Sequence, residues 1–218
     1  MLRLLSDRRA ELAAERRPVV NRLHRLLRDL HPGGAPTELS VETASRLLGR
    51  ARPKGAADAE RKRMARQLLA DLRRLDRALA DRVRCAAAVA ASGTTLTTIF
   101  GISDVLAAKI LGHTGDVSRF PSAGRFASYT GTAPIEVSSG EVTRHRLSRG
   151  GNRSLNHALH LAARVQIMHP GPGRDHYGRK LAEHKGSSEA LRSLKRQLAK
   201  VVYRHMVADH AGRLANLP

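Results

Sequence analysis

The sequence predicts a mainly α-helical protein, in which an N-terminal helical hairpin of coiled-coil type precedes a helical domain. That domain is expected to contain a helix–hairpin–helix and one short β-hairpin. Leucine and alanine recur at helical spacing through most of the 218 residues. Glycine and proline gather in short breaks, at residues 31–36, 52–56 and 170–173. One window, residues 133–147, reads instead as two extended segments around a Ser-Ser-Gly turn.

The charge balance predicts a polyanionic partner. The chain has 39 Lys and Arg against 19 Asp and Glu, a formal net charge of +20, and most of the basic residues are arginine. Because guanidinium groups suit phosphate, nucleic acid is the simplest partner. Codon bias in a GC-rich genome would also enrich arginine. If that is the origin of the charge, the alternative is a purely structural helical protein. Aromatic residues make up only 3% of the chain, so the core must be aliphatic.

The remaining composition favours a cytoplasmic protein without a membrane segment. Cys85, the single cysteine, lies in an Ala/Val run and is expected to be a small buried hydrophobic residue in a reducing compartment. No apolar run approaches the ~20 residues that span a bilayer. The charged N-terminus has no apolar region of the kind found in a secretory signal.

Residues 1–92 are expected to form a coiled-coil-like linker or dimerisation region. A helix over residues 2–30 carries apolar residues seven apart, and Pro18 is expected to kink or interrupt it. Ser40 is a good N-cap for a short helix that ends near Gly49. The two long helices of this region could pack on each other or on a second copy, and a homo-oligomer that assembles through residues 1–90 is expected. The apolar residues seven apart are Leu5, Leu12, Val19 and Leu26.

A long helix is expected over residues 59–91. Its many arginines form either a solvated face or a nucleic-acid groove, and the spacing does not separate the two. Its apolar stripe is Met64, Leu68, Leu72, Leu75, Leu79 and Val83.

Residues 93–210 are expected to form a second domain that begins with a helix–hairpin–helix over residues 94–112. In such a module the backbone of the hairpin and the start of the second helix meet a phosphate without reading sequence. The corresponding residues here are Gly101, Ile102 and Ser103. The alternative is an ordinary corner between two helices, since one of the usual two glycines is replaced by Ser103.

The stretch from Ser122 to Asn152 offers the most chemistry. After a short helix ending near Tyr129, two extended segments flank a turn at Ser138-Ser139-Gly140. For a serine hydroxyl to attack a phosphodiester, the charge on the non-bridging phosphate oxygens must be neutralised, for example by guanidinium groups. The hydroxyl itself must be activated by a base or a metal. No obvious base lies nearby, so a hairpin beside a phosphate-binding patch is the alternative. The expected phosphate-binding residues are Arg144, Arg146, Arg149, Asn152 and Arg153.

The C-terminal helices are expected to support this stretch over residues 152–208. One helix should run to His169, a second from Arg174 to Lys185, and a third from a cap at Ser187 to about Ala208, with a loose tail. His157 and His160 lie three apart, but no cysteine or acid at suitable spacing completes a metal site. The acids do not cluster either, so no metal site is expected in this chain.

Taken in order, these blocks resemble a known family. The segment from FGISDVLAAKILGHTGDVSRF through the SSG turn to HRLSRGGNRSLNHALHLAA resembles the C-terminal transposase domain of the IS110/IS116/IS902 family of insertion-sequence transposases, which are related to Piv-type DNA invertases. The resemblance covers roughly residues 94–205. The preceding helices resemble the coiled-coil linker of the family.

The resemblance implies a serine-nucleophile DNA recombinase. The serine before the glycine is the nucleophile in that family, which corresponds to Ser139, with Ser138 as the fallback. The resemblance also implies DNA and a structured guide RNA as partners, and an N-terminal RuvC-like acidic domain that binds Mg²⁺. Because that domain is absent here, we expect no cofactor in this chain and no cleavage by it alone. The alternative is a non-catalytic DNA- or RNA-binding remnant or dimerisation partner.

Overall fold

The protein is mainly helical, as the sequence predicts, and divides into two compact units. The smaller unit is Asp7–Arg82, and the larger joins Met1–Ser6 to Val83–Pro218. No helix in the described part of the chain is both long and apolar enough to cross a bilayer. The computed structural model describes residues 1–80, 83–139, 142–146 and 150–215, and the side chains of these residues outside 136–149.

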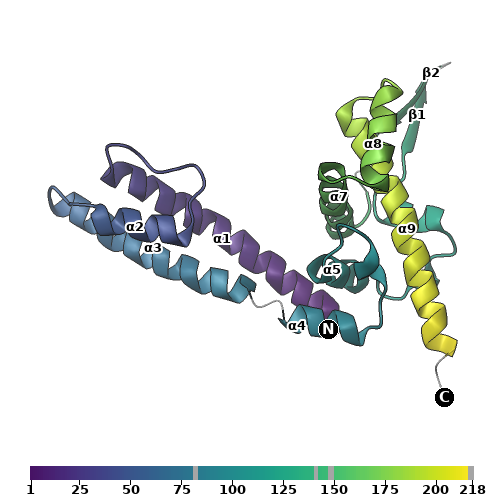
Figure 1. Cartoon of the computed structure of the whole chain (residues 1–218), viewed down its shortest axis with the longest axis horizontal. Coiled ribbons are helices and arrows are strands. Elements are labelled where there is room, and N and C mark those ends of the chain that lie inside the picture. The colour runs from purple at the N-terminus through teal and green to yellow at the C-terminus, as the bar shows by residue number, and fades with distance from the viewer. Residues whose placement is uncertain (81–82, 140–141, 147–149, 216–218) are drawn as a thin grey trace. The chain divides into compact units, whose positions relative to one another are not determined.

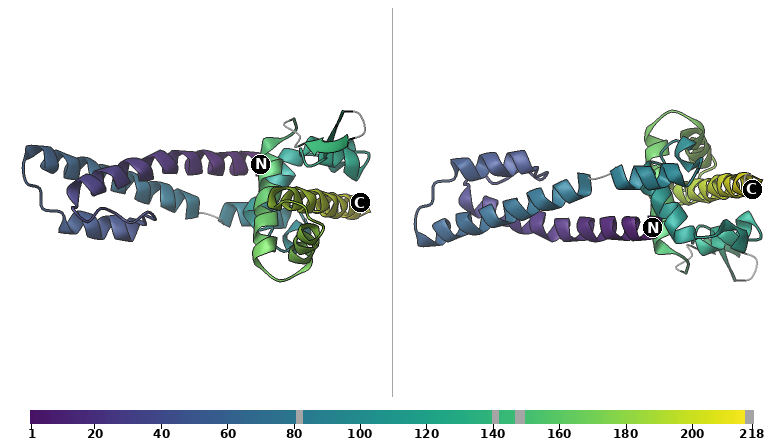
Figure 2. Two further views of the ribbon diagram at one scale, coloured as in Figure 1. Left: turned by 90° about the horizontal axis from the view of Figure 1, so that it is seen from above. Right: turned by 90° about the horizontal axis from the view of Figure 1, so that it is seen from below.

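The smaller unit is a pair of long helices with a short helix packed on them. Its elements are α1 (Leu2–Leu30, in this unit from Asp7 onward), α2 (Val41–Arg50) and α3 (Ala56–Ala80). Helices α1 and α3 run side by side in opposite directions (Figures 1 and 2). Aliphatic side chains from all three helices and from the loop before α2 form one core, whose buried members are Leu23, Leu27, Leu39, Ala44, Leu48, Ala65, Leu69 and Leu72.

Local signals place α2 where the sequence predicts it. The Ser40 hydroxyl accepts a hydrogen bond from the Thr43 backbone N–H at 3.1 Å, which satisfies a donor that a helix start leaves without a partner. The helix ends at Arg50, one residue beyond the predicted Gly49.

The structure differs in detail from the expectations for the two long helices. Helix α1 continues without interruption through Pro18. Proline has no N–H to donate within the helix, and the residues Leu12 and Leu23 on either side of it are buried. In the first part of α3 the core takes a line shifted by one residue, through Ala65 and Leu69, whereas Leu72 and Leu75 of the predicted stripe are buried as expected. Met64 is therefore 44% exposed, although the predicted stripe includes it.

In the structure, the region of the predicted helix 59–91 contains two helices that belong to different units. Helix α3 ends at Ala80 and α4 spans Val83–Ala91, while residues 81 and 82 lie outside the described residues. Val83, the last member of the predicted stripe, is 76% exposed, and Cys85 is buried as expected. Helix α4 therefore packs within the larger unit, which the sequence analysis begins at residue 93.

The larger unit is built around α9, which packs against α6, α7 and α8 and both short 3-10 helices (Figure 1). Its buried core is aliphatic, with Phe126 as its largest fully buried side chain. After α4, the elements of the unit are η1 (Leu96–Thr98), α5 (Asp104–Thr114), η2 (Val117–Arg119), α6 (Ala123–Tyr129), β1 (Ile135–Ser139), β2 (Val142–Arg146), α7 (Arg153–Met168), α8 (Pro172–Ala182) and α9 (Ser187–Ala215).

The C-terminal helix is longer than predicted. It continues to Ala215, where the sequence analysis ends it near Ala208. Beyond the predicted end, the Asp209 carboxylate accepts hydrogen bonds from the Thr95 backbone N–H at 2.9 Å and from the Thr95 hydroxyl at 2.8 Å. Arg213 donates to the Ser92 carbonyl at 3.2 Å. These bonds tie the last turns of α9 to the loop before η1.

Candidate nucleic-acid interface

The two predicted serines lie on a strand. Strands β1 and β2 pair antiparallel, and their register sets Ser138 opposite Thr143 and Ser139 opposite Val142. The sequence analysis places both serines in the turn, and the described backbone instead makes them the last two residues of β1. The β-branched residues 142 and 143 favour this longer ladder. Gly140 lies outside the described residues.

The same register brings part of the predicted arginine set beside the serine strand. Arg144 stands opposite Val137, and Arg146 stands opposite Ile135, where the ladder begins. Arg153 is the first residue of α7 and is exposed, while Arg149 lies outside the described residues. The backbone therefore carries two arginines along the strand next to β1 and one at the start of the following helix.

Asn152 has a structural role at the root of the hairpin. Its Oδ1 accepts from the Leu155 N–H at 3.1 Å, which caps α7, and its Nδ2 donates to the Tyr129 hydroxyl at 3.3 Å. Its own backbone N–H donates to the Tyr129 carbonyl at 2.7 Å. The side chain predicted to contact nucleic acid is thus engaged inside the fold, and it holds the end of α6 against the start of α7.

The two ends of the hairpin segment meet backbone to backbone. Gly151 has a φ of +100°, and a Cβ placed there would lie 2.8 Å from both the Gly131 nitrogen and the Tyr129 carbonyl oxygen. Only glycine fits such a contact at such a φ. Gly131 and Gly151 therefore fix where the chain leaves the helical body and where it returns.

A half-buried amide and a buried ammonium complete this root. Asn156 Nδ2 donates to the carbonyls of Thr130 at 2.9 Å and Gly131 at 3.0 Å. Its Oδ1 accepts from Lys195 Nζ at 2.6 Å, and Lys195 is only 7% exposed. Burial, and after it the nearby Arg192, lowers the pKa of Lys195. No role was predicted from the sequence for either residue.

Arg119 places a cation beside the same root. Its guanidinium carbon lies 4.5 Å from the ring centroid of Phe120 and 4.5 Å from that of Tyr129. The hydrogen bond from Asn152 is the main cause that lowers the pKa of the Tyr129 hydroxyl, and Arg119 adds to it. Tyr129 also donates to the His113 carbonyl at 3.2 Å. The aromatic ring thus joins the hairpin root to the end of α5.

The turn before α5 has mixed properties as a phosphate site. Gly101 has a φ of +86°, Ile102 is buried, and the exposed Ser103 occupies the N-cap position without a side-chain cap bond. The backbone N–H of Ile102 already donates to the Ile99 carbonyl at 3.0 Å. Asp104, in the first turn of α5, adds a negative charge that opposes phosphate.

The histidines of α7 do not join other metal ligands. Across the described residues, no three or more His, Cys, Asp or Glu side chains are grouped so that they could hold a metal ion. Burial is the first cause that lowers the pKa of both His157 and His160, and Lys195 lowers both further. These residues therefore do not fit the Mg²⁺ that the family resemblance implies for a separate acidic domain.

Comparison with known proteins points to one family. Residues 93–178 match the model of the transposase IS116/IS110/IS902 family. The uncharacterized 44.8 kDa protein of insertion element IS116 from Streptomyces clavuligerus is 38% identical over 105 residues, which cover 47% of this chain and 26% of that protein. The uncharacterized 43.6 kDa protein of insertion element IS110 from Streptomyces coelicolor is 37% identical over 109 residues, 50% of this chain and 27% of its own length.

A third relative agrees. The uncharacterized 42 kDa protein of insertion element IS900 from Mycobacterium paratuberculosis is 34% identical over 113 residues, 51% of this chain and 28% of its own length. The chain thus spans about a quarter of the length of these curated relatives.

The root of the hairpin makes a first prediction. Asn156→Ala should lower the free energy of unfolding by about 3 kcal/mol, because it leaves two carbonyls and a buried ammonium without partners. Adding Lys195→Met should recover at least about 1 kcal/mol of that loss, since the unpaired charge is then removed. Urea denaturation measures both values. Adding Lys200→Met, an exposed lysine of the same helix, should recover nothing, and equal recovery from both lysines would refute the pairing.

The histidines whose pKa is lowered make a second prediction. Burial lowers the folded-state pKa of His157, His160 and His176 below 6.5. The unfolded chain then binds more protons, so the free energy of unfolding should fall as the pH drops below about 6.5. Urea unfolding between pH 8 and pH 5 tests this. His160→Gln should flatten the fall below pH 6.5 and leave the behaviour above pH 7.5 unchanged, and an unaltered acid limb would contradict the assignment.

Proposed function

Because residues 93–178 match the model of the transposase IS116/IS110/IS902 family, we propose that this chain is the part of a transposase that holds DNA and carries its nucleophile, Ser139. Ser139 ends β1 beside the arginine-bearing strand β2, and this register is the observation that carries the proposal. Ser138 is the fallback nucleophile.

The proposed step is a phosphoryl transfer to serine. The Ser139 oxygen bonds to phosphorus, and one bond between phosphorus and a deoxyribose oxygen breaks. The proton lost by the serine balances the proton gained by the departing sugar hydroxyl. Arg144, Arg146 and Arg153 would neutralise the phosphate oxygens while charge builds up on them. We assign the metal chemistry of the reaction to an acidic domain that completes the site, and derive no step through it.

The backbone around residues 101–103 is a proposed second DNA contact, of the helix–hairpin–helix type. Structured guide RNA is a further proposed partner, because the chain carries a formal net charge of +20. We also propose that residues 1–90 mediate self-association, because α1 and α3 present long helical surfaces that suit a coiled coil.

A second candidate function is binding without cleavage. Among the described residues no group of metal ligands stands near the serine strand. A chain of this kind would occupy DNA or RNA, or pair with a complete transposase, and would not cut by itself. This candidate keeps the nucleic-acid contacts and gives Ser139 no catalytic role.

A covalent trap separates the two candidates. The chain is incubated with end DNA of its element, with and without a supplied acidic metal-binding domain, and a labelled protein–DNA adduct is sought on a denaturing gel. We expect an adduct only with the acidic domain, lost in Ser139→Ala and kept in Ser138→Ala. Loss in Ser138→Ala alone would move the nucleophile to Ser138. An adduct in both single variants and in the double variant would refute a serine nucleophile.

Salt dependence tests the phosphate contact at the start of α7. Arg153→Gln should weaken DNA binding and reduce the slope of log K against log salt concentration by about 0.9, the value for one lost phosphate contact. Fluorescence anisotropy at several salt concentrations measures this slope. Arg164→Gln removes the same charge from an exposed position on the same helix and should leave the slope unchanged. Equal slopes for the two variants would exclude Arg153 from the interface.

A further inference from the structure

The larger unit contains a basic groove that the serine hairpin does not explain. The groove has a volume of about 970 Å³ and lies between the segment 98–100, the end of α7, α8 and α9. Among the described residues that line it, none is acidic, and three are cations: Arg179, Lys180 and Lys185. Its volume lies in the range of ligand-binding sites.

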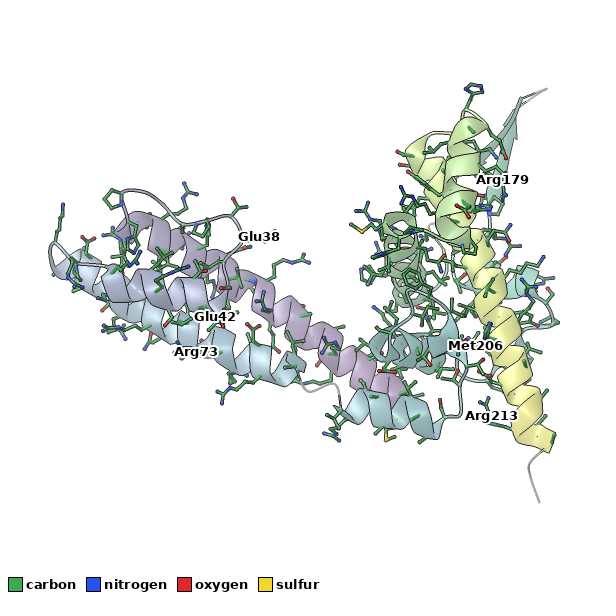
Figure 3. The ribbon with its side chains drawn as sticks, in the orientation of Figure 1. Glu38, Glu42, Arg73, Arg179, Met206 and Arg213 are labelled. Carbon is green, nitrogen blue, oxygen red and sulfur yellow. The ribbon has the colours of Figure 1, made fainter. Side chains whose placement is uncertain are left out.

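The cationic wall is held in place by hydrogen bonds. Arg179, labelled on α8 in Figure 3, donates to His176 Nδ1 at 3.2 Å. Nδ1 is therefore an acceptor, so Nε2 carries the proton and donates to Ser193 on α9 at 2.9 Å. This relay links the guanidinium to a second helix and limits its freedom.

Acid near this wall does not cancel its charge. Glu183 accepts from Lys180 Nζ at 2.8 Å through both carboxylate oxygens, and it lies 3.3 Å from Lys185 Nζ. One carboxylate thus lies between two ammonium groups, and the Arg179 guanidinium adds a third positive charge, so this group of side chains keeps a net positive charge. An anion is the complementary ligand.

The lining of the groove also includes an aromatic residue, Phe100. Phe100 is 57% exposed, although its backbone is firmly held. Gln166 Nε2 donates to the Phe100 carbonyl at 2.7 Å, and the next residue, Gly101, packs so tightly on α7 that a Cβ would lie 3.0 Å from the Ala162 carbonyl oxygen. The His169 ring meets the Phe100 ring at 79°, with centroids 5.5 Å apart. An exposed ring on a fixed backbone loses little entropy when another ring stacks on it.

Apolar and further polar groups also line the groove. Ile99, Leu194 and Leu198 contribute apolar surface. His205 lines the groove as well, and its Nδ1 lies 2.8 Å from the Thr95 hydroxyl. Since that hydroxyl donates to the Asp209 carboxylate, His205 Nδ1 must be the donor, which leaves Nε2 for a ligand.

We propose that this groove binds an unpaired nucleotide of a nucleic-acid strand, with its base against Phe100 and its phosphate against Arg179. An anionic ligand fits the cations, and a flat apolar face on the same ligand fits the ring. A paired base hides its faces in the duplex stack, so the combination selects a single strand. The proposal rests on the proposed nucleic-acid function and adds a site distinct from the serine hairpin.

Binding of short oligonucleotides to the full chain tests the groove. Fluorescein-labelled dT12 and rU12 and a matched DNA duplex are titrated at low salt by anisotropy. A dT12 with one internal 2-aminopurine reports stacking by its quenching. Phe100→Ala should weaken single-strand binding about tenfold and abolish the quenching, while Phe100→Tyr keeps both. Arg179→Gln should also weaken single-strand binding, whereas Arg174→Gln, an exposed arginine of the same helix outside the groove, should not.

The outcomes separate this proposal from the one it rests on. Weakened binding of dT12 or rU12 by both groove variants supports the groove, and the preferred sugar identifies DNA or RNA as its source. If the chain binds the duplex but neither single strand, or if both groove variants match Arg174→Gln, the groove proposal is overturned and the proposed function stands. If wild-type chain binds no nucleic acid at all, both proposals fail. Circular dichroism of each variant shows that it remains folded.

Discussion

The hydrogen bond between Lys195 and Asn156 fixes the geometry on which the serine hairpin depends. An ammonium group has only donors, so the amide of Asn156 must turn its oxygen toward Lys195. Its nitrogen is then aimed at the carbonyls of Thr130 and Gly131. One buried charge thereby sets the orientation of an amide, and the amide sets the position of the backbone where the hairpin begins.

This arrangement completes the hydrogen bonds at the end of α6. Carbonyls at a helix C-terminus have no partner within the helix. Here the carbonyls of Phe126, Ala127 and Ser128 accept from the N–H groups of the following loop, and that of Tyr129 accepts from Asn152. Asn156 takes the next two. Helices α6, α7 and α9 therefore share one polar junction, and a strand leaves it with a defined starting point.

Local signals in the sequence predicted much of the fold. The cap at Ser40 forms as a polar side chain before an apolar run suggests. The mainly helical class followed from the spacing of leucine and alanine. These features depend on neighbours within one turn, so the sequence shows them directly.

Features set by distant contacts were not predictable in the same way. The periodicity at the start of α3 allows two adjacent apolar lines, and only the packing of α1 and α2 selects Ala65 over Met64. The extension of α9 depends on a loop more than a hundred residues earlier. The polar junction left one signal, since Lys195 interrupts the apolar stripe of α9 directly after Leu194. A lysine there reads as surface until the partner on α7 is known.

The close approach of Gly131 and Gly151 has a consequence for variation in this region. Residues 132–150 leave the helical body and return to it at nearly one point. A segment with adjacent ends closes at an entropic cost that rises only slowly with its length. The length of this segment can therefore change while the helices that hold its two ends keep their packing. We expect changes in nucleic-acid specificity to arise within residues 132–150, while Gly131 and Gly151 are retained.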